Sequence, residues 1–257
     1  HDEPWFKKRI VSRLKITGSY GGLGANFLEP YNFDPIAFGP IPYIMNNTRY
    51  VNGHAASLKS TDLKWETSKS TDVGVELGFL NNDLTVGVNY FHKKNVDLLA
   101  TINLNLSSGQ IFEINTSNDT PYVNTASVEN KGWEFMVNYR KQLGSDWHIS
   151  ASANLSTLRN KVLALGENVQ PIYSGSFSGK FDDSPSVTKP GYAIGSFYGY
   201  RIDGFDHEGN FAFTDRTGDG IVNAEDKDIL GSPIPDFSYG INIDLQYRNF
   251  DLTMFFN

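Results

Sequence analysis

Residues 71–90 read TDVGVELGFLNNDLTVGVNY, and this stretch decides the fold. Apolar side chains occupy every second position from Val73 to Phe79 and again from Leu84 to Tyr90, with polar residues or glycine between them. This period of two is typical of a β-strand with one apolar and one polar face. Asn81, Asn82 and Asp83 separate the two runs, as in a tight hairpin. The stretch therefore predicts two antiparallel strands.

The same alternation recurs along the chain, whereas amphipathic helical spacing is scarce. Further alternating runs cover Arg13–Tyr20, Trp133–Tyr139, Trp147–Leu155, Phe237–Tyr247 and Phe250–Phe256. We therefore expect an all-β protein with about seven long strands.

The lengths of the connections identify the kind of β protein. Short turns close the hairpins near Asn82, Gly144 and Asn249, whereas long loops are expected at about 21–70, 93–129 and 157–236. Outer-membrane β-barrels alternate short periplasmic turns with long extracellular loops. The strand-like run Ser196–Asp203 is placed within the third loop, because a membrane crossing there would put the turn at Arg248 on the wrong side.

Composition agrees with a membrane barrel and argues against other classes. The net charge of −7 disfavours nucleic-acid binding, and no run reaches the ~20 apolar residues of a spanning helix. Several aromatic residues lie near strand ends, as in the aromatic girdles of barrels: Trp133, Tyr139, Trp147, Tyr247 and Phe250. The alternative interpretation is that these side chains fill the core of a β-sandwich. Both ends of the chain look cut. Seven strands are fewer than the smallest usual closed barrel, so residues 1–257 are expected to be part of a larger one.

One loop segment carries a specific chemical pattern. Residues 215–226 read DRTGDGIVNAED, which places oxygen-bearing residues and one glycine as in an EF-hand calcium loop. The predicted ligands are Asp215, Thr217, Asp219, the carbonyl of Ile221, Asn223 and Asp226. The alternative is a polar turn held by local backbone hydrogen bonds. Calcium would be structural, and no catalytic residue is predicted.

Several short motifs together resemble the SusC-like (SusC/RagA) TonB-dependent transporters of Bacteroidota. The motifs are LKITGSYG at 14–21, DLKWE at 62–66, NKGWE at 130–134, NLS at 154–156 with NKV at 160–162, and GSFYGY at 195–200. The resemblance implies a section of a 22-stranded outer-membrane barrel, with the family's plug domain absent from these residues. It also implies a SusD-like surface lipoprotein and the TonB complex as partners.

Import of a large nutrient, a glycan or a peptide, is the function expected from this resemblance. Aromatic residues of the third loop either contact the ligand or pack against one another within the loop; examples are Tyr192, Phe197, Tyr198 and Tyr200. A secreted, calcium-bound β-sandwich that binds glycans is the alternative, and a barrel used for protein export or surface assembly is a third hypothesis. Catalysis is not expected: a glycosidase needs two carboxylates at a defined separation in a cleft, and the sequence does not show such a separation for acidic pairs such as Asp182 and Asp183.

Overall fold

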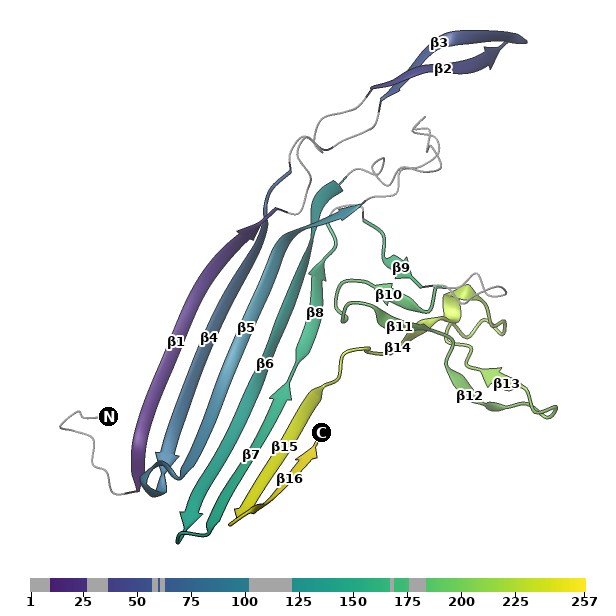
Figure 1. Ribbon diagram of the computed structural model, residues 1–257. Helices are drawn as coiled ribbons and strands as arrows, with labels where there is room; N and C mark the ends of the chain where they lie inside the picture. The colour runs from purple at the N-terminus through teal and green to yellow at the C-terminus, as the bar shows by residue number, and fades with distance from the viewer. Residues whose placement is uncertain are drawn as a thin grey trace.

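The computed structural model describes residues 10–26, 37–56, 60, 63–101, 122–166, 169–175 and 184–257. Its main element is one curved antiparallel sheet of eight strands (Figure 1). Seven follow one another as neighbours: β1 (Val11–Ala25), β4 (Glu66–Phe79), β5 (Leu84–Thr101), β6 (Tyr122–Leu143), β7 (Trp147–Thr157), β15 (Phe237–Tyr247) and β16 (Phe250–Phe256). The eighth, β8 (Arg159–Ala164), pairs with β6. The sheet does not close on itself, so the expectation of about seven long strands in an unclosed barrel section is confirmed.

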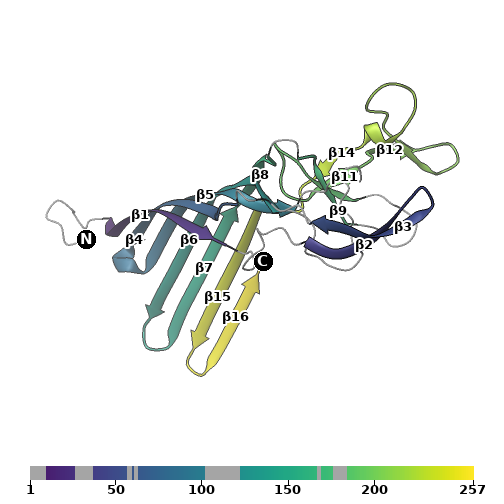
Figure 2. The same cartoon turned by 90° about the horizontal axis from the view of Figure 1, so that it is seen from above.

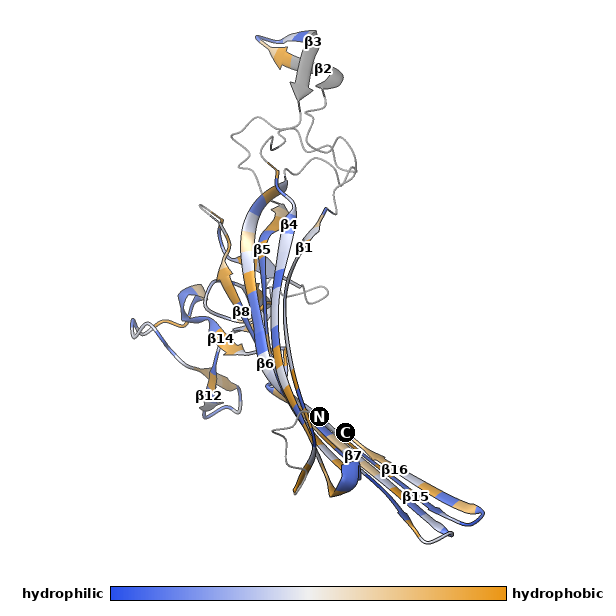
Figure 3. Cartoon of the chain, turned by 90° about the vertical axis from the view of Figure 1, so that its left-hand side faces the viewer, coloured by the Kyte–Doolittle hydropathy of each residue, from blue (hydrophilic) through white to orange (hydrophobic). Residues whose placement is uncertain are grey.

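The two faces of this sheet differ in polarity because the strands pair in a register that aligns their alternation. On β4 and β5, Val75 pairs with Val88, and Gly74 pairs with Asn89. Directly paired residues point to the same face. One face therefore gathers apolar side chains, many of them solvent-exposed, such as Ile16 and Phe135. We call this the apolar face and the opposite one the polar face. Figure 3 shows the resulting alternation of colours along the strands.

All three predicted tight turns lie at one end of the sheet, which we call the turn end. The first contains the 3-10 turn η1 (Leu80–Asn82), whose three residues have positive φ angles. Adjacent turns are linked to their neighbours. The carbonyl of Asp83 accepts from the Arg140 N–H at 2.8 Å, and the carbonyl of Asp146 accepts from the Arg248 N–H at 2.9 Å. These bonds hold the turns at fixed spacing.

The strands extend further than the sequence alternation suggested, at the end opposite the turns (the loop end). β5 continues to Thr101 and β6 begins at Tyr122. The region expected as the first loop contains a separate hairpin, β2 (Ala37–Met45) and β3 (Thr48–Ala56). Alternation fades there because both faces of these extensions carry polar residues. The strand β8 was not predicted.

A small sheet and a hairpin sit at the loop end, on the far side of β8 from the N-terminal strands (Figures 1 and 2). The sheet contains β9 (Ile172–Ser174), β10 (Ser186–Thr188), β11 (Ser196–Gly199) and β14 (Asp228–Gly231). The hairpin pairs β12 (Ile202–Phe205) with β13 (Phe211–Phe213), and a short 3-10 turn η3 (Ala224–Asp226) follows. The prediction that Ser196–Asp203 belongs to a loop region and not to the large sheet is confirmed.

The buried apolar cluster lies where this loop region meets the large sheet. Val128, Val162 and Leu165 are nearly inaccessible, and Leu98 and Ala126 pack against them. Between this cluster and the turn end, the described residues of the long strands enclose no comparable core. No helix in the described part of the chain is long and apolar enough to cross a membrane.

Candidate functional site

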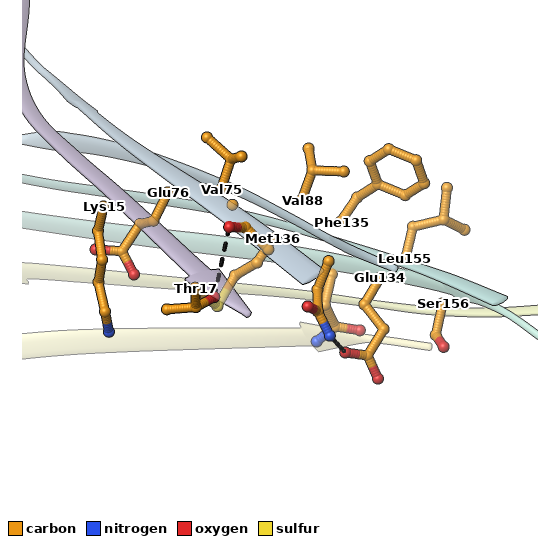
Figure 4. A pocket seen from close by; sticks show the side chains of 14 residues that line it. Lys15, Thr17, Val75, Glu76, Val88, Glu134, Phe135, Met136, Leu155 and Ser156 are labelled. Carbon is orange, nitrogen blue, oxygen red and sulfur yellow. Dashed lines mark hydrogen bonds between the residues drawn. The ribbon is translucent and has the colours of Figure 1, made fainter. Parts of the chain in front are cut away.

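A hollow of about 430 Å³ opens on the polar face at the middle of the large sheet. Figure 4 shows that Lys15, Thr17, Glu76, Glu134 and Met136 point to its side, whereas Val75, Val88, Phe135 and Leu155 point the opposite way. Val75, Val88, Phe135 and Leu155 border the hollow as well. The lining residues on the polar face come from β1, β4, β5, β6 and β7: Lys15, Thr17, Gly74, Glu76, Gly87, Asn89, Glu134, Met136, Asn154 and Ser156.

The hollow exists because glycine stands where the strand pattern would otherwise place a polar side chain. A Cβ added at Gly87 would lie 3.6 Å from the Met136 Cε, which is ordinary contact. A Cβ added at Gly74 would lie 2.9 Å from both the Asn89 Oδ1 and the Thr17 Oγ1. The neighbouring side chains thus lean over Gly74, while a Cβ at Gly87 would make only ordinary van der Waals contact, with the Met136 side chain.

Charged and amide groups surround this space. The Arg13 guanidinium lies 3.3 Å from the Glu76 carboxylate, and Lys15 is the cross-strand partner of Glu76. The Asn89 amide donates to the Glu134 carboxylate at 3.2 Å. Donors and acceptors spread around a shallow hollow suit ligands rich in hydroxyl or amide groups.

This hollow and its lining residues were not predicted from the sequence. The sequence does contain one indication of the hollow, because Gly74 and Gly87 both occupy polar-face positions in their alternating runs. Recognising the hollow also requires the register between five strands, which places the two glycines on adjacent rows.

A second, more polar hollow of about 1180 Å³ lies on the same face toward the turn end. His148, Asn138, Gln142 and Asp244 are among its lining residues. His148 therefore lies on the polar face of the sheet.

The loop aromatics are engaged mainly in packing contacts. The rings of Tyr198 and Tyr173 lie 5.5 Å apart, and those of Tyr200 and Phe213 lie 5.6 Å apart. Burial raises the pKa of the Tyr198 hydroxyl. Phe197, by contrast, remains half exposed. Asp182 and Asp183 lie outside the described residues.

Within the predicted calcium loop, the structure brings Asp215 and Asp226 together through Thr217. The Thr217 Oγ1 lies 3.2 Å from the Asp215 Oδ1 and 3.1 Å from the Asp226 Oδ1. Asp226 is nearly inaccessible and accepts from the backbone N–H groups of Arg216, Thr217 and Asn223. These hydrogen bonds lower the pKa of Asp226 to about 2.

The other predicted ligands serve separate turns. Asp219 accepts from the Ile221 N–H at 2.8 Å, and Asn223 accepts from the Glu225 N–H at 2.8 Å. Asp215 also accepts from the Gly220 N–H at 2.7 Å. Among the residues that the structure describes, no three His, Cys, Asp or Glu side chains gather in a way that could hold a metal ion. The loop therefore holds its shape through carboxylate-to-N–H bonds, and calcium binding stays a prediction.

Comparison with known proteins gives consistent matches over almost the whole chain. A family profile described as "TonB dependent receptor-like, beta-barrel" matches residues 14–257. TonB-dependent receptor P3 of Formosa agariphila is 33% identical over 96% of this chain and 25% of its own length. TonB-dependent receptor SusC of Bacteroides thetaiotaomicron is 27% identical over 95% of this chain and 24% of its own length. The chain thus spans about a quarter of the curated relatives that it matches.

Solved structures give the same fold. The RagAB peptide importer in an "open-open" state aligns with a TM-score of 0.74 over 96% of this chain and 26% of that chain, at 20% sequence identity. A second structure, of the RagAB peptide transporter, aligns with a TM-score of 0.69 at 20% identity.

Proposed function

Because this chain belongs to the TonB-dependent receptor β-barrel family and resembles its SusC-like members, we propose that it forms part of a conduit for a large nutrient across the outer membrane. The family resides in the outer membrane, and the two faces of the sheet fit that setting. The apolar face would contact lipid, and the polar face would line the lumen. With the turn end in the periplasm, the loop region from β9 to β14 lies on the outer side of the membrane.

The observation that carries the proposal is the glycine-floored hollow on the polar face. A lumen that passes large polar molecules needs space and exchangeable hydrogen-bonding groups. Gly87 provides space, and Glu76, Asn89 and Glu134 provide the groups. The cargo would be a glycan or a peptide, because both present many hydroxyl or amide groups. A peptide is the cargo named for the RagAB structures that share this fold.

We propose transport and not catalysis as the activity, with a SusD-like surface lipoprotein and the TonB complex as partners. The relatives named as TonB-dependent receptors support this view. The sandwich alternative lacks support, since in the described part of the chain no second sheet packs on the apolar face.

Import is tested with the full-length transporter in a deletion strain complemented with variants. Gly87→Leu places a larger side chain in the hollow and is expected to lower uptake of labelled oligosaccharide or oligopeptide several-fold. Gly18→Leu is the matched control, because Gly18 pairs with Val73 on the apolar face and has nothing within 4 Å of an added Cβ. Equal uptake by both variants and the parent protein would contradict the proposal.

A role in protein export or surface assembly is the competing use of the same barrel. Co-purification separates the two. A SusD-like lipoprotein and an imported cargo support uptake, whereas an outward-bound protein held in the lumen contradicts it.

We also propose that residues 215–226 bind calcium as a structural ion that pins the loop. Oxygen atoms of Asp215, Thr217 and Asp226 already lie within one hydrogen-bonded group, and Asp219 is exposed beside them. Isothermal titration of calcium into the full-length protein tests this. The expected result is heat of binding that Asp219→Ala abolishes; absence of heat from the parent protein would overturn it.

A further inference from the structure

At the loop end of the apolar face, apolar and aromatic side chains give way to basic ones. One row across the sheet contains Val73, Tyr90 and Trp133, which are paired in register, and the Tyr90 and Trp133 rings lie 5.0 Å apart. The next two rows toward the loop end carry five basic side chains: Lys69, Lys94, Lys131, Arg159 and Lys161. We call these five residues the basic cluster.

Strand register places the basic cluster on the apolar face. Lys131 and Arg159 are direct partners, and Lys94 and Lys161 are both partners of Glu129. Direct partners share a face, and residues two apart on a strand point the same way. Lys131 lies two residues from Trp133, so the cluster continues the same surface. Lys93, one residue from Lys94, points to the polar face.

The positive charge of this surface is only slightly compensated. Glu129 is the carboxylate within it, and its two oxygens contact Lys131 at 3.0 Å and His92 at 2.8 Å. Within the described part of the chain, no carboxylate lies within ion-pair distance of the other four basic side chains. Lys69, Arg159 and Lys161 are exposed.

A hollow of about 530 Å³ lies beside this cluster, where β8 separates from the start of β15. Lys131, Arg159 and Lys161 line it together with the carboxylates Glu129 and Asp236. Its other walls are Leu158, Asn160, Gly191, Ala193, Ser232 and Ile234. The recess thus has three basic side chains and two carboxylates at its edge, and Glu129 is already paired with Lys131 and His92.

The position of the cluster identifies the molecule that would meet it. Aromatic side chains of barrels lie at the membrane interface. The basic cluster lies two to four residues beyond Trp133 toward the loop end. At ~3.3 Å per residue on a strand tilted by ~40°, this places it roughly 5–10 Å further from the membrane centre than Trp133. Lipid phosphates occupy this level.

We propose that the basic cluster binds the phosphorylated headgroup of a lipid in the outer leaflet. Charge-assisted bonds from Lys and Arg to phosphate oxygens would hold it, as in other phosphate sites. This inference uses the family's place in the outer membrane but does not depend on the cargo. The bound lipid would brace β8 and the loop region beside it.

The test uses full-length protein in nonionic detergent, titrated with diphosphoryl lipid A, with retained lipid counted by native mass spectrometry. Removal of one basic side chain near a charged lipid surface weakens binding about fivefold. Lys131→Gln, Arg159→Gln and Lys161→Gln together are therefore expected to weaken retention on the order of a hundredfold. Lys131→Arg and Lys161→Arg should retain binding, which shows that charge and not folding is being measured.

Lys94→Gln and Lys93→Gln form the matched pair, since the two lysines are adjacent but point to opposite faces. Weaker retention in Lys94→Gln alone supports the site, and equal loss in both overturns it. Lipid A without phosphates should bind poorly. Equal binding of that lipid, or full displacement by inorganic phosphate at the lipid's own concentration, would overturn the assignment to a phosphorylated lipid headgroup.

Discussion

Gly132 on β6 lies directly against the backbone of Thr157 at the end of β7, so that an added Cβ would stand 1.9 Å from the Thr157 carbonyl oxygen. The Thr157 hydroxyl also accepts from the Trp133 N–H at 3.0 Å. At this point the chain leaves β7, passes Leu158 and returns to β6 as β8. Any side chain larger than hydrogen at Gly132 would therefore clash with the backbone, which explains the glycine in the NKGWE motif.

Gly132→Ala is therefore expected to destabilise the barrel by about 3 kcal/mol, because backbone atoms must move to admit the methyl group. The measurement is the temperature at which the folded band of the full-length protein disappears in heat-modifiability electrophoresis. Gly87→Ala is the control, since its Cβ would meet only side-chain atoms of Met136, at 3.6 and 3.9 Å. Equal midpoints for the two variants would contradict this explanation of Gly132.

Much of the large sheet was predictable because its two faces meet different surroundings. The seven long strands and the turns at Asn82, Gly144 and Arg248 all followed from alternation and turn chemistry. At the loop end the alternation of apolar and polar residues fades, since polar residues occur on both faces of the strands. The strand β8 has no alternation, and only its pairing with β6 makes it a strand. The hollow above Gly87 required the register of five strands, which sequence alone does not provide.

The aromatic side chains at the two ends of the apolar face are expected to lie at opposite membrane interfaces. The Trp147 and Tyr247 rings lie 4.5 Å apart at the turn end, and Trp133 contacts Tyr90 toward the loop end. In variants that keep only one of these tryptophans, lipids brominated near the carbonyl should quench fluorescence about twofold more than lipids brominated near the chain terminus. Stronger quenching of either tryptophan by the lipid brominated near the chain terminus would contradict the placement of these residues at the membrane interfaces.

The ion pair between Asp146 and Arg248 is expected to contribute little stability, although it joins two turns. The Arg248 guanidinium lies 3.0 Å from the Asp146 carboxylate, but both side chains are well exposed. Exposed pairs contribute about 0.2–1 kcal/mol and are screened by salt. A double-mutant cycle with Asp146→Asn and Arg248→Gln should give a coupling energy below about 1 kcal/mol that falls further in high salt. A larger, salt-independent coupling would mean that the pair is shielded from water in the whole protein.

Loop 215–226 should be stable at neutral pH and open only under strongly acidic conditions. Backbone N–H groups lower the pKa of Asp226 from 3.8 to about 2 in the folded loop. A depressed folded pKa stabilises the fold fully above the unfolded value and loses this contribution as pH falls toward the folded value. Hydrogen exchange, corrected for its intrinsic pH dependence, should therefore show constant protection above pH 5 and progressive loss between about 4 and 2.

Asp226→Asn should remove this acid transition and expose the loop at neutral pH, since an amide has only one oxygen to accept the bonds that two carboxylate oxygens now accept. With calcium chelated in all samples, Asp219→Asn is the control, because Asp219 accepts only the Ile221 N–H within its own turn. It should leave the transition between pH 4 and 2 in place. If the two variants lose protection equally at neutral pH, the loop is not organised around Asp226. Protection that stays constant down to pH 2 in the parent protein would contradict the lowered pKa as its source of stability.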